Sequence, residues 1–135
     1  MVTLPRATYN AMLTHVQGGY PNEACGILAA IDTAVVKHYP AVNASTEPQT
    51  FSIIDGPELF AINKEIELND WTLFSYYHSH PATEAYPSPR DIRYSQGWPG
   101  TYYLIFSLKQ RESPILRAYL IAGEQVDEHE IVITD

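Results

Sequence analysis

The length, composition and charge of this chain exclude several classes of protein before any motif is considered. Its 135 residues match one typical domain, and an apolar content of 45% with ten tyrosines argues against a disordered chain. Sixteen acidic side chains outnumber eight scattered basic ones, which argues against a protein that tracks a nucleic-acid backbone. We therefore expect one globular domain over residues 1–135.

The single cysteine, Cys25, excludes an internal disulfide and a cysteine-rich zinc module. No positively charged start followed by an apolar run marks a signal peptide, and no run approaches the ~18 apolar residues of a membrane-spanning helix. These features predict a cytoplasmic protein without a membrane or nucleic-acid partner. Cys25 itself is expected to be a small buried core residue rather than a ligand or a nucleophile.

The first twenty residues predict a short strand followed by a helix. Residues 2–4 begin the strand, and Pro5 suits the first turn of the helix, where its missing N–H costs nothing. Gly18 and Gly19 end the helix. Its apolar side chains lie on roughly one face, made of Ala7, Met12, Leu13 and Val16.

Two strands and an extended run precede a second helix. The strands cover residues 23–30 and 34–39, and the extended run covers residues 50–54. A capping box, with Asp55 as the cap and Glu58 three positions on, marks the start of the helix. The apolar stripe of this helix consists of Leu59, Ile62 and Ile66, and the place of Phe60 in it stays open.

The second half of the chain is rich in strands. A strand with many aromatic residues covers residues 71–79, and a proline-rich loop follows it. Three strand-like runs then end the chain, at residues 102–108, 115–121 and 129–134. Strands interleaved with two long helices predict an α/β sandwich around a mixed β-sheet.

The residues that carry chemistry begin with His78-Ser79-His80-Pro81 and continue to Ser88-Pro89-Arg90-Asp91. Side chains two apart on a strand project from the same face, about 6.6 Å apart along it, so two imidazoles can converge on one ion. A carboxylate from the next element could supply a third ligand. Two histidines and one carboxylate, with a fourth position left for water, form a catalytic rather than a structural zinc arrangement.

A purely structural interpretation of the same residues stays open. Paired histidines are often ordinary core or surface residues. Ser88 as N-cap, Pro89 at the first position and an acid at the third also make a good helix start. The two interpretations are compatible, because a helix start can hold an aspartate rigidly. Ser79 should point to the opposite side of the strand, where packing or a local hydrogen bond is its expected role.

Together with Glu23, these segments resemble the signature of the JAMM (MPN+) metalloproteases: an N-terminal Glu, His-Ser/Thr-His-Pro, and Ser-x-x-Asp several residues later. The resemblance covers almost the whole chain and implies the JAMM/MPN (cytidine-deaminase-like) α/β sandwich, a mixed β-sheet flanked by helices. It implies a Zn²⁺ ion held by His78, His80 and Asp91. It also implies Glu23 as the general base and Ser88 as the hydrogen-bond donor to the oxyanion. A fourth-ligand role for Glu23 stays open.

A closer resemblance, to the small bacterial JAMM enzymes of the Mec type, is carried by residues 23–26, 77–80 and 82–88. Those enzymes release cysteine from the C-terminus of a small ubiquitin-like sulfur-carrier protein in cysteine biosynthesis. The resemblance implies the same amide hydrolysis here. Two alternatives stay open: a peptidase of this fold with another peptide or a phage- or cell-wall-related substrate, and a non-catalytic MPN scaffold that only binds partners.

Several further residues carry expectations about recognition. An exposed sheet edge beside the zinc could receive the carrier's tail by strand addition, and residues 82–87 could form a wall for the leaving residue. Asn43 ends a strand and suits a turn; because an Asn near this position lies by the cleft in related enzymes, a substrate contact is the alternative. His15, His38 and His129 have no partners at ligand spacing and are expected to be ordinary surface residues.

Overall fold

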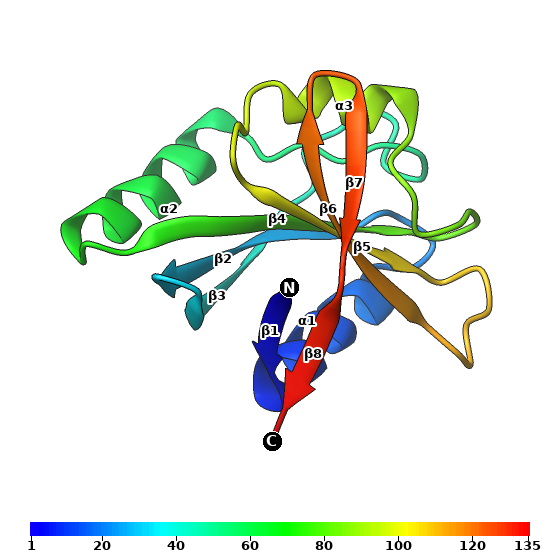
Figure 1. The fold of residues 1–135 in the computed structure, drawn as a ribbon. Helices are drawn as coiled ribbons and strands as arrows, with labels where there is room; N and C mark the ends of the chain where they lie inside the picture. The colour runs from blue at the N-terminus through cyan, green and yellow to red at the C-terminus, as the bar shows by residue number, and fades with distance from the viewer.

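The computed structural model describes all 135 residues. It contains eight strands and three helices (Figure 1). In chain order these are β1 Val2–Pro5, α1 Arg6–Gly19, β2 Cys25–Ile31, β3 Ala34–Ala41, α2 Gly56–Leu68, β4 Thr72–His80, α3 Pro89–Ser95, β5 Tyr102–Ser107, β6 Ile115–Ala122, β7 Gln125–His129 and β8 Ile131–Thr134. None of the three helices has the length and apolar character needed to span a bilayer.

Six of the strands form one mixed sheet in the order β3-β2-β4-β5-β6-β7. Within it β4 and β5 run parallel, and all other neighbours are antiparallel. Helices α2 and α3 cover one face, whereas α1 and the small parallel pair β1–β8 cover the other (Figure 1). Each face has its own cluster of 13 buried apolar residues. The predicted mixed sheet flanked by helices is therefore confirmed.

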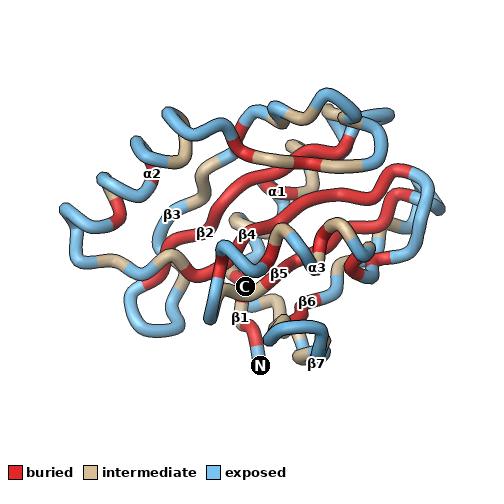
Figure 2. The backbone as a smooth tube through the Cα atoms, turned by 90° about the horizontal axis from the view of Figure 1, so that it is seen from above, coloured by how far each residue is buried: buried red, intermediate tan, exposed pale blue.

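In strand β4 successive side chains point to opposite faces of the sheet and so pack into the two different cores. Tyr76 packs into the core under α2 and α3, and its neighbour Tyr77 packs into the core under α1. A register shift opposite residue 74 interrupts the alternation, so that Phe74 lies in the same core as Tyr77. Because the sheet is covered on both faces, its central strands β2, β4 and β5 are almost continuously buried (Figure 2).

Helix α1 ends at Gly19 as predicted but differs from its prediction at two residues. Pro5 is the last residue of β1 and the N-cap rather than part of the first helical turn, and the buried residues of α1 are Met12 and Val16. Leu13 packs against the same core. Ala7, in contrast, is exposed, so the apolar face is narrower than the sequence pattern indicates.

Helix α2 begins where the sequence predicts, but without the predicted capping box. Asp55 occupies the N-cap position, and its side chain makes no capping hydrogen bond. Glu58 instead accepts the backbone N–H of Val42 at 3.0 Å, which ties α2 to the segment after β3. In the predicted stripe Ile62 and Ile66 are buried, whereas Phe60, whose place in it the sequence leaves open, is 68% exposed and lies outside it.

Two predicted strands differ in the structure. Residues 50–54 form no strand, and only Ile54 makes an isolated bridge, to Asn43. The run predicted at 129–134 belongs to two strands instead of forming one: only His129 belongs to β7, the last strand of the large sheet, which begins earlier, at Gln125, while Ile131–Thr134 form β8 and pair in parallel with β1. The carbonyl of Glu130 accepts the N–H of Val2 at 2.7 Å. Neighbouring residues of the chain therefore belong to two different sheets, and the strand pattern of the sequence does not predict this.

Candidate metal and catalytic site

The end of β4 brings two imidazoles together in a buried place. His78 is 0% and His80 4% exposed, and their Nε2 atoms lie 3.1 Å apart. Strand β4 is paired on both sides, with β2 and β5, which fixes its register. Nδ1 of His80 lies 2.8 Å from the carbonyl oxygen of Glu84. Since a carbonyl only accepts, Nδ1 donates this hydrogen bond, which leaves Nε2 as the potential ligand atom that faces the other histidine.

Asp91 reaches both histidines from the first turn of α3. Its Oδ2 lies 3.2 Å from Nε2 of His78 and 3.1 Å from Nε2 of His80. The predicted helix start is confirmed as a capping box: the hydroxyl of Ser88 accepts the N–H of Asp91 at 3.1 Å, and Oδ2 of Asp91 accepts the N–H of Ser88 at 2.9 Å. Burial acts to raise the pKa of Asp91, but the imidazoles and the cap hydrogen bonds hold it well below its usual range.

Three donor atoms that face one another at 3.1 to 3.2 Å fit a single metal ion. In a tetrahedral zinc site with bonds of about 2.05 Å, neighbouring ligand atoms lie about 3.3 Å apart. Two imidazole nitrogens and one carboxylate oxygen are also a donor set that zinc accepts, with one position left open. His78, His80 and Asp91 therefore fit the ion that the sequence implies.

Glu23 stands beside these three groups as a second buried carboxylate. It is 3% exposed, and together with His78 and His80 it offers ligand atoms within 4.8 Å of one another. It makes no hydrogen bond or ion pair with either histidine, and its Oε1 is buried without a partner. Burial raises the pKa of Glu23, and the two histidines oppose this shift. An unpartnered buried carboxylate oxygen is costly, which indicates a functional rather than a packing role.

Backbone hydrogen bonds fix the position of Glu23. Its N–H donates to the carbonyl of Pro48 at 2.7 Å, and its own carbonyl accepts from Nδ2 of Asn43 at 3.0 Å. The next residue, Ala24, donates its N–H to the hydroxyl of Ser79 at 2.9 Å and accepts the N–H of Ser79 at 3.0 Å. The expected local role of Ser79 is thus confirmed, because it joins the end of β4 to the residue after Glu23.

The side chain of Asn43 forms several hydrogen bonds within the loop that contacts the backbone of Glu23. Its Nδ2 also donates to the carbonyl of Phe51 at 3.0 Å, and its Oδ1 accepts the N–H groups of Ser45 at 3.0 Å and Ile53 at 3.2 Å. These contacts use both ends of the amide. The geometry favours the turn interpretation of Asn43 over a substrate contact.

Cys25 follows the site along β2 and is fully buried. Burial raises the pKa of its thiol to about 12, so it carries no thiolate at neutral pH. The expectation of a small core residue is confirmed.

His15 and His38 differ from the expectation of ordinary surface residues. Both are partly buried, and Nδ1 of His15 and Nε2 of His38 each lie 2.6 Å from the hydroxyl oxygen of Tyr77. The trio lies in the core under α1, on the opposite face of the sheet from His78. No spacing links residues 15, 38 and 77, so the sequence offers no signal for this cluster.

The site is not directly beside a sheet edge. The edge strands are β3 and β7. Ala41 at the end of β3 pairs with Cys25, which in turn pairs with His78. The nearer edge is therefore two strands, about 10 Å, from the first histidine. The expected position of an edge beside the site is therefore wrong, and recognition of a carrier tail by strand addition stays an untested prediction.

A hollow of about 410 Å³ opens next to the histidines. The loop after β4 and the end of β5 line it, with His80, Ala82, Thr83, Glu84, Tyr86, Ser88 and Lys109. The Ser88 hydroxyl accepts a cap hydrogen bond but keeps its own proton free to donate. The sequence pattern indicates Ser88 but not Lys109, which lies outside every motif.

Comparisons with known proteins agree with this site. A family model described as prokaryotic homologs of the JAB domain matches residues 5–125. The CysO-cysteine peptidase of Mycobacterium tuberculosis (strain H37Rv) is 34% identical over 128 residues, which cover 93% of this chain and 86% of that protein. The desampylase of Haloferax volcanii is 35% identical over 104 residues, 73% of this chain and 74% of that protein.

Solved structures show the same fold. The solution structure of DSY2949 from Desulfitobacterium hafniense has a TM-score of 0.86 and 36% identity, covering 100% of this chain and 94% of that one. AF2198, a JAB1/MPN domain protein from Archaeoglobus fulgidus, has a TM-score of 0.64 at 18% identity, with 100% of both chains covered. The expected JAMM/MPN fold is confirmed. The chain belongs to the prokaryotic JAB-domain (JAMM/MPN) family and is a peptidase of that family.

Proposed function

We propose that this protein is a zinc metallopeptidase that hydrolyses the amide bond between cysteine and the C-terminus of a small ubiquitin-like sulfur-carrier protein. Two relatives support the substrate class. One is named a CysO-cysteine peptidase, and its match spans 93% of this chain. The other, from Thermus thermophilus, is named a probable TtuB-protein conjugate cleaving protease and is 32% identical over 90 residues.

The observation that carries the proposal is the convergence of three donor atoms beside the Glu23 carboxylate, one oxygen of which is buried without a partner. Nε2 of His78, Nε2 of His80 and Oδ2 of Asp91 lie 3.1 to 3.2 Å from one another, and we assign them to the Zn²⁺ ion. Glu23, with its buried free oxygen, is assigned as the general base. Ser88, which lines the adjoining hollow with a hydroxyl proton to donate, is assigned as the oxyanion donor.

A zinc ion in this setting supplies Lewis-acid chemistry, lowering the pKa of a water molecule toward ~7 and polarising the scissile carbonyl. Glu23 accepts a proton from the attacking water and later delivers it to the nitrogen of the leaving cysteine. Ser88 donates a hydrogen bond to the carbonyl oxygen as negative charge develops on it. The C–N bond breaks, one water is consumed, and the products are a carrier with a free carboxylate and cysteine with a free amine.

The proposed setting is cysteine biosynthesis in a reducing cytoplasm. The free, fully buried thiol of Cys25 fits a compartment in which disulfides are rare. The intact donor set favours an enzyme over a non-catalytic scaffold.

The test uses purified protein and a CysO–cysteine adduct, with released cysteine measured by mass spectrometry. Treatment with a chelator followed by its removal should abolish release, and one equivalent of Zn²⁺ should restore it. Unchanged release from fully metal-free protein would contradict the zinc assignment. If the zinc-loaded protein left the adduct intact but cleaved unrelated peptides, the substrate assignment would be wrong and the alternative peptidase would stand.

A further inference from the structure

Lys109 lies beside the proposed site without belonging to any motif. Strand β5 runs parallel to β4 with Ser107 opposite His80, so the residues after Ser107 emerge where the histidine-bearing strand ends. The N–H of Leu108 donates to the carbonyl of His80 at 3.0 Å, and the N–H of Lys109 donates to the hydroxyl of Ser107 at 3.3 Å. These bonds fix the backbone of Lys109 next to the site.

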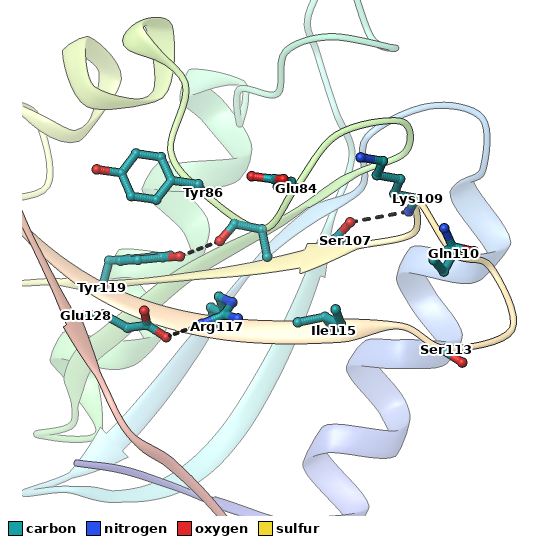
Figure 3. A pocket seen from close by; sticks show the side chains of 11 residues that line it. Glu84, Tyr86, Ser107, Lys109, Gln110, Ser113, Ile115, Arg117, Tyr119 and Glu128 are labelled. Atoms are coloured by element: carbon teal, nitrogen blue, oxygen red, sulfur yellow. Dashed lines mark hydrogen bonds and ion pairs between the residues drawn. The ribbon is translucent and has the colours of Figure 1, made fainter.

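The side chain of Lys109 is exposed and lines two adjoining hollows. One is the 410 Å³ hollow that contains His80 and Ser88. The other, of about 500 Å³, extends over β6 (Figure 3). Glu84 and Tyr86 also line both hollows, and Figure 3 shows the Lys109 side chain directed from the end of β5 toward the loop that carries Glu84.

Lys109 is the unpaired cation of this region. The one other cation in the two hollows, Arg117, is held by Glu128 at 2.8 Å (Figure 3). The ammonium of Lys109 makes no ion pair and no hydrogen bond, although the chain carries a formal charge of −8. A free ammonium beside a catalytic site, in an otherwise acidic molecule, offers a place for an anionic group of a ligand.

We propose that Lys109 binds the α-carboxylate of the amino acid that is cleaved from the carrier, an inference that rests on the proposed function. In a carrier–cysteine adduct this carboxylate is attached to the carbon next to the leaving nitrogen, so it must lie close to the site. In an isopeptide bond to a protein lysine the leaving nitrogen has no such neighbour. Glu84 repels a carboxylate, and Lys109 is the one Lys or Arg that lines the hollow next to His80. The residue therefore selects for a single leaving amino acid over a protein conjugate.

The experiment compares kcat/KM for two CysO adducts, one ending in cysteine and one in cysteine amide, which lacks the negative charge. The zinc-loaded wild type should prefer the free carboxylate by about tenfold, the effect expected of one charge-assisted hydrogen bond at a partly exposed site. The kcat/KM of Lys109→Gln should fall about tenfold on the cysteine adduct and should equal the wild-type value on the amide. Lys109→Arg, which keeps the charge, should retain most of the preference.

The matched control is Lys64→Gln, which removes the same charge from an exposed position on α2 and should alter neither rate. An equal loss on both adducts in Lys109→Gln would indicate a merely structural role and overturn the inference. Wild-type rates in Lys109→Gln on the cysteine adduct would overturn it as well, while leaving the proposed function in place. Failure of the wild type to cleave either adduct would overturn the proposed function and the inference with it.

Discussion

Glu23 and Asp91 are both buried carboxylates, and their surroundings differ in the way that the proposed chemistry requires. Asp91 contacts both imidazoles and two groups of its own helix start, whereas Oε1 of Glu23 has no partner at all. A ligand needs a fixed orientation, and a base needs an oxygen that is free to take a proton. Asp91 therefore suits a metal ligand, and Glu23 suits a general base.

We expect Glu23→Gln to keep the metal and lose turnover by at least about 10²-fold, because the amide preserves shape but accepts no proton. Zinc content by mass spectrometry and cysteine release, measured on the same sample, check this. Glu67→Gln, at an exposed position of α2, is the control and should match the wild type. Full turnover would contradict the assigned base, and loss of zinc would support the alternative of a fourth ligand.

Asp91→Asn should weaken zinc binding by more than about 100-fold, since even outer-shell partners of a metal site contribute 10- to 100-fold. Competition with a chromophoric chelator measures the affinity. Asp127→Asn, which removes an exposed carboxylate from β7, should leave it unchanged. Tight binding by Asp91→Asn would assign the third ligand to another group.

Among the elements, the loop between β3 and α2 decides where Glu23 stands. The carbonyl of Pro48 accepts the N–H of Glu23 at 2.7 Å, and Nδ2 of Asn43 donates to the carbonyl of Glu23 at 3.0 Å. The loop has no regular secondary structure beyond one bridge, so side-chain hydrogen bonds take the place of a strand ladder. The geometry of the site therefore depends on Asn43, which touches none of the proposed ligands.

Asn43→Ala should lower the free energy of unfolding by about 2–3 kcal/mol, because it leaves several partly buried backbone groups without partners. It should also reduce turnover while zinc remains bound, since the loop also anchors the proposed base. Urea unfolding, zinc content and cysteine release measure the three effects. Asn63→Ala, exposed on α2, should stay within about 0.5 kcal/mol of the wild type. An equal free energy of unfolding in Asn43→Ala and Asn63→Ala would contradict the role of Asn43 in holding the loop.

At the scale of the whole molecule, the trio of His15, His38 and Tyr77 joins α1, β3 and β4 through one core. The hydroxyl of Tyr77 can donate to only one ring, so the other histidine must donate to it. Burial, together with the nearby His15, lowers the pKa of His38 to about 4, and burial lowers the pKa of His15 as well.

These shifts predict a loss of stability in mild acid. The folded-state pKa of His38 lies below the ~6.5 of an unfolded chain, so the unfolded state takes up the proton first as the pH falls from about 6.5 toward 4. After allowance for solvent screening, this contribution should be about 1 kcal/mol. Urea unfolding at pH 7 and pH 5 measures it as the difference between the wild type and His38→Gln. His129→Gln is the control, and an identical pH dependence in all three proteins would contradict the role of His38.

The sequence by itself determined the parts of this protein that depend on short spacings. Two histidines on one strand share a face whatever surrounds the strand, and Ser88-Pro89 followed by Asp91 specifies a capping box within one turn. At Asp55 and Glu58 a similar pattern failed, because Glu58 found a partner in Val42, outside its own helix. A local rule holds only where no distant group competes for the same hydrogen bond.

Only the tertiary structure decided how distant segments meet. The pairing of β2 with β4 brings Glu23 beside His78 and His80, which lie 55 and 57 positions later in the chain. The packing of α1 and β3 against β4 places His15 and His38 on Tyr77. It also divides the last strand-like run between two sheets and sets Lys109 beside His80. The physical reason is that long-range pairing is set by burial of two whole sheet faces, a sum over many side chains that no single spacing records.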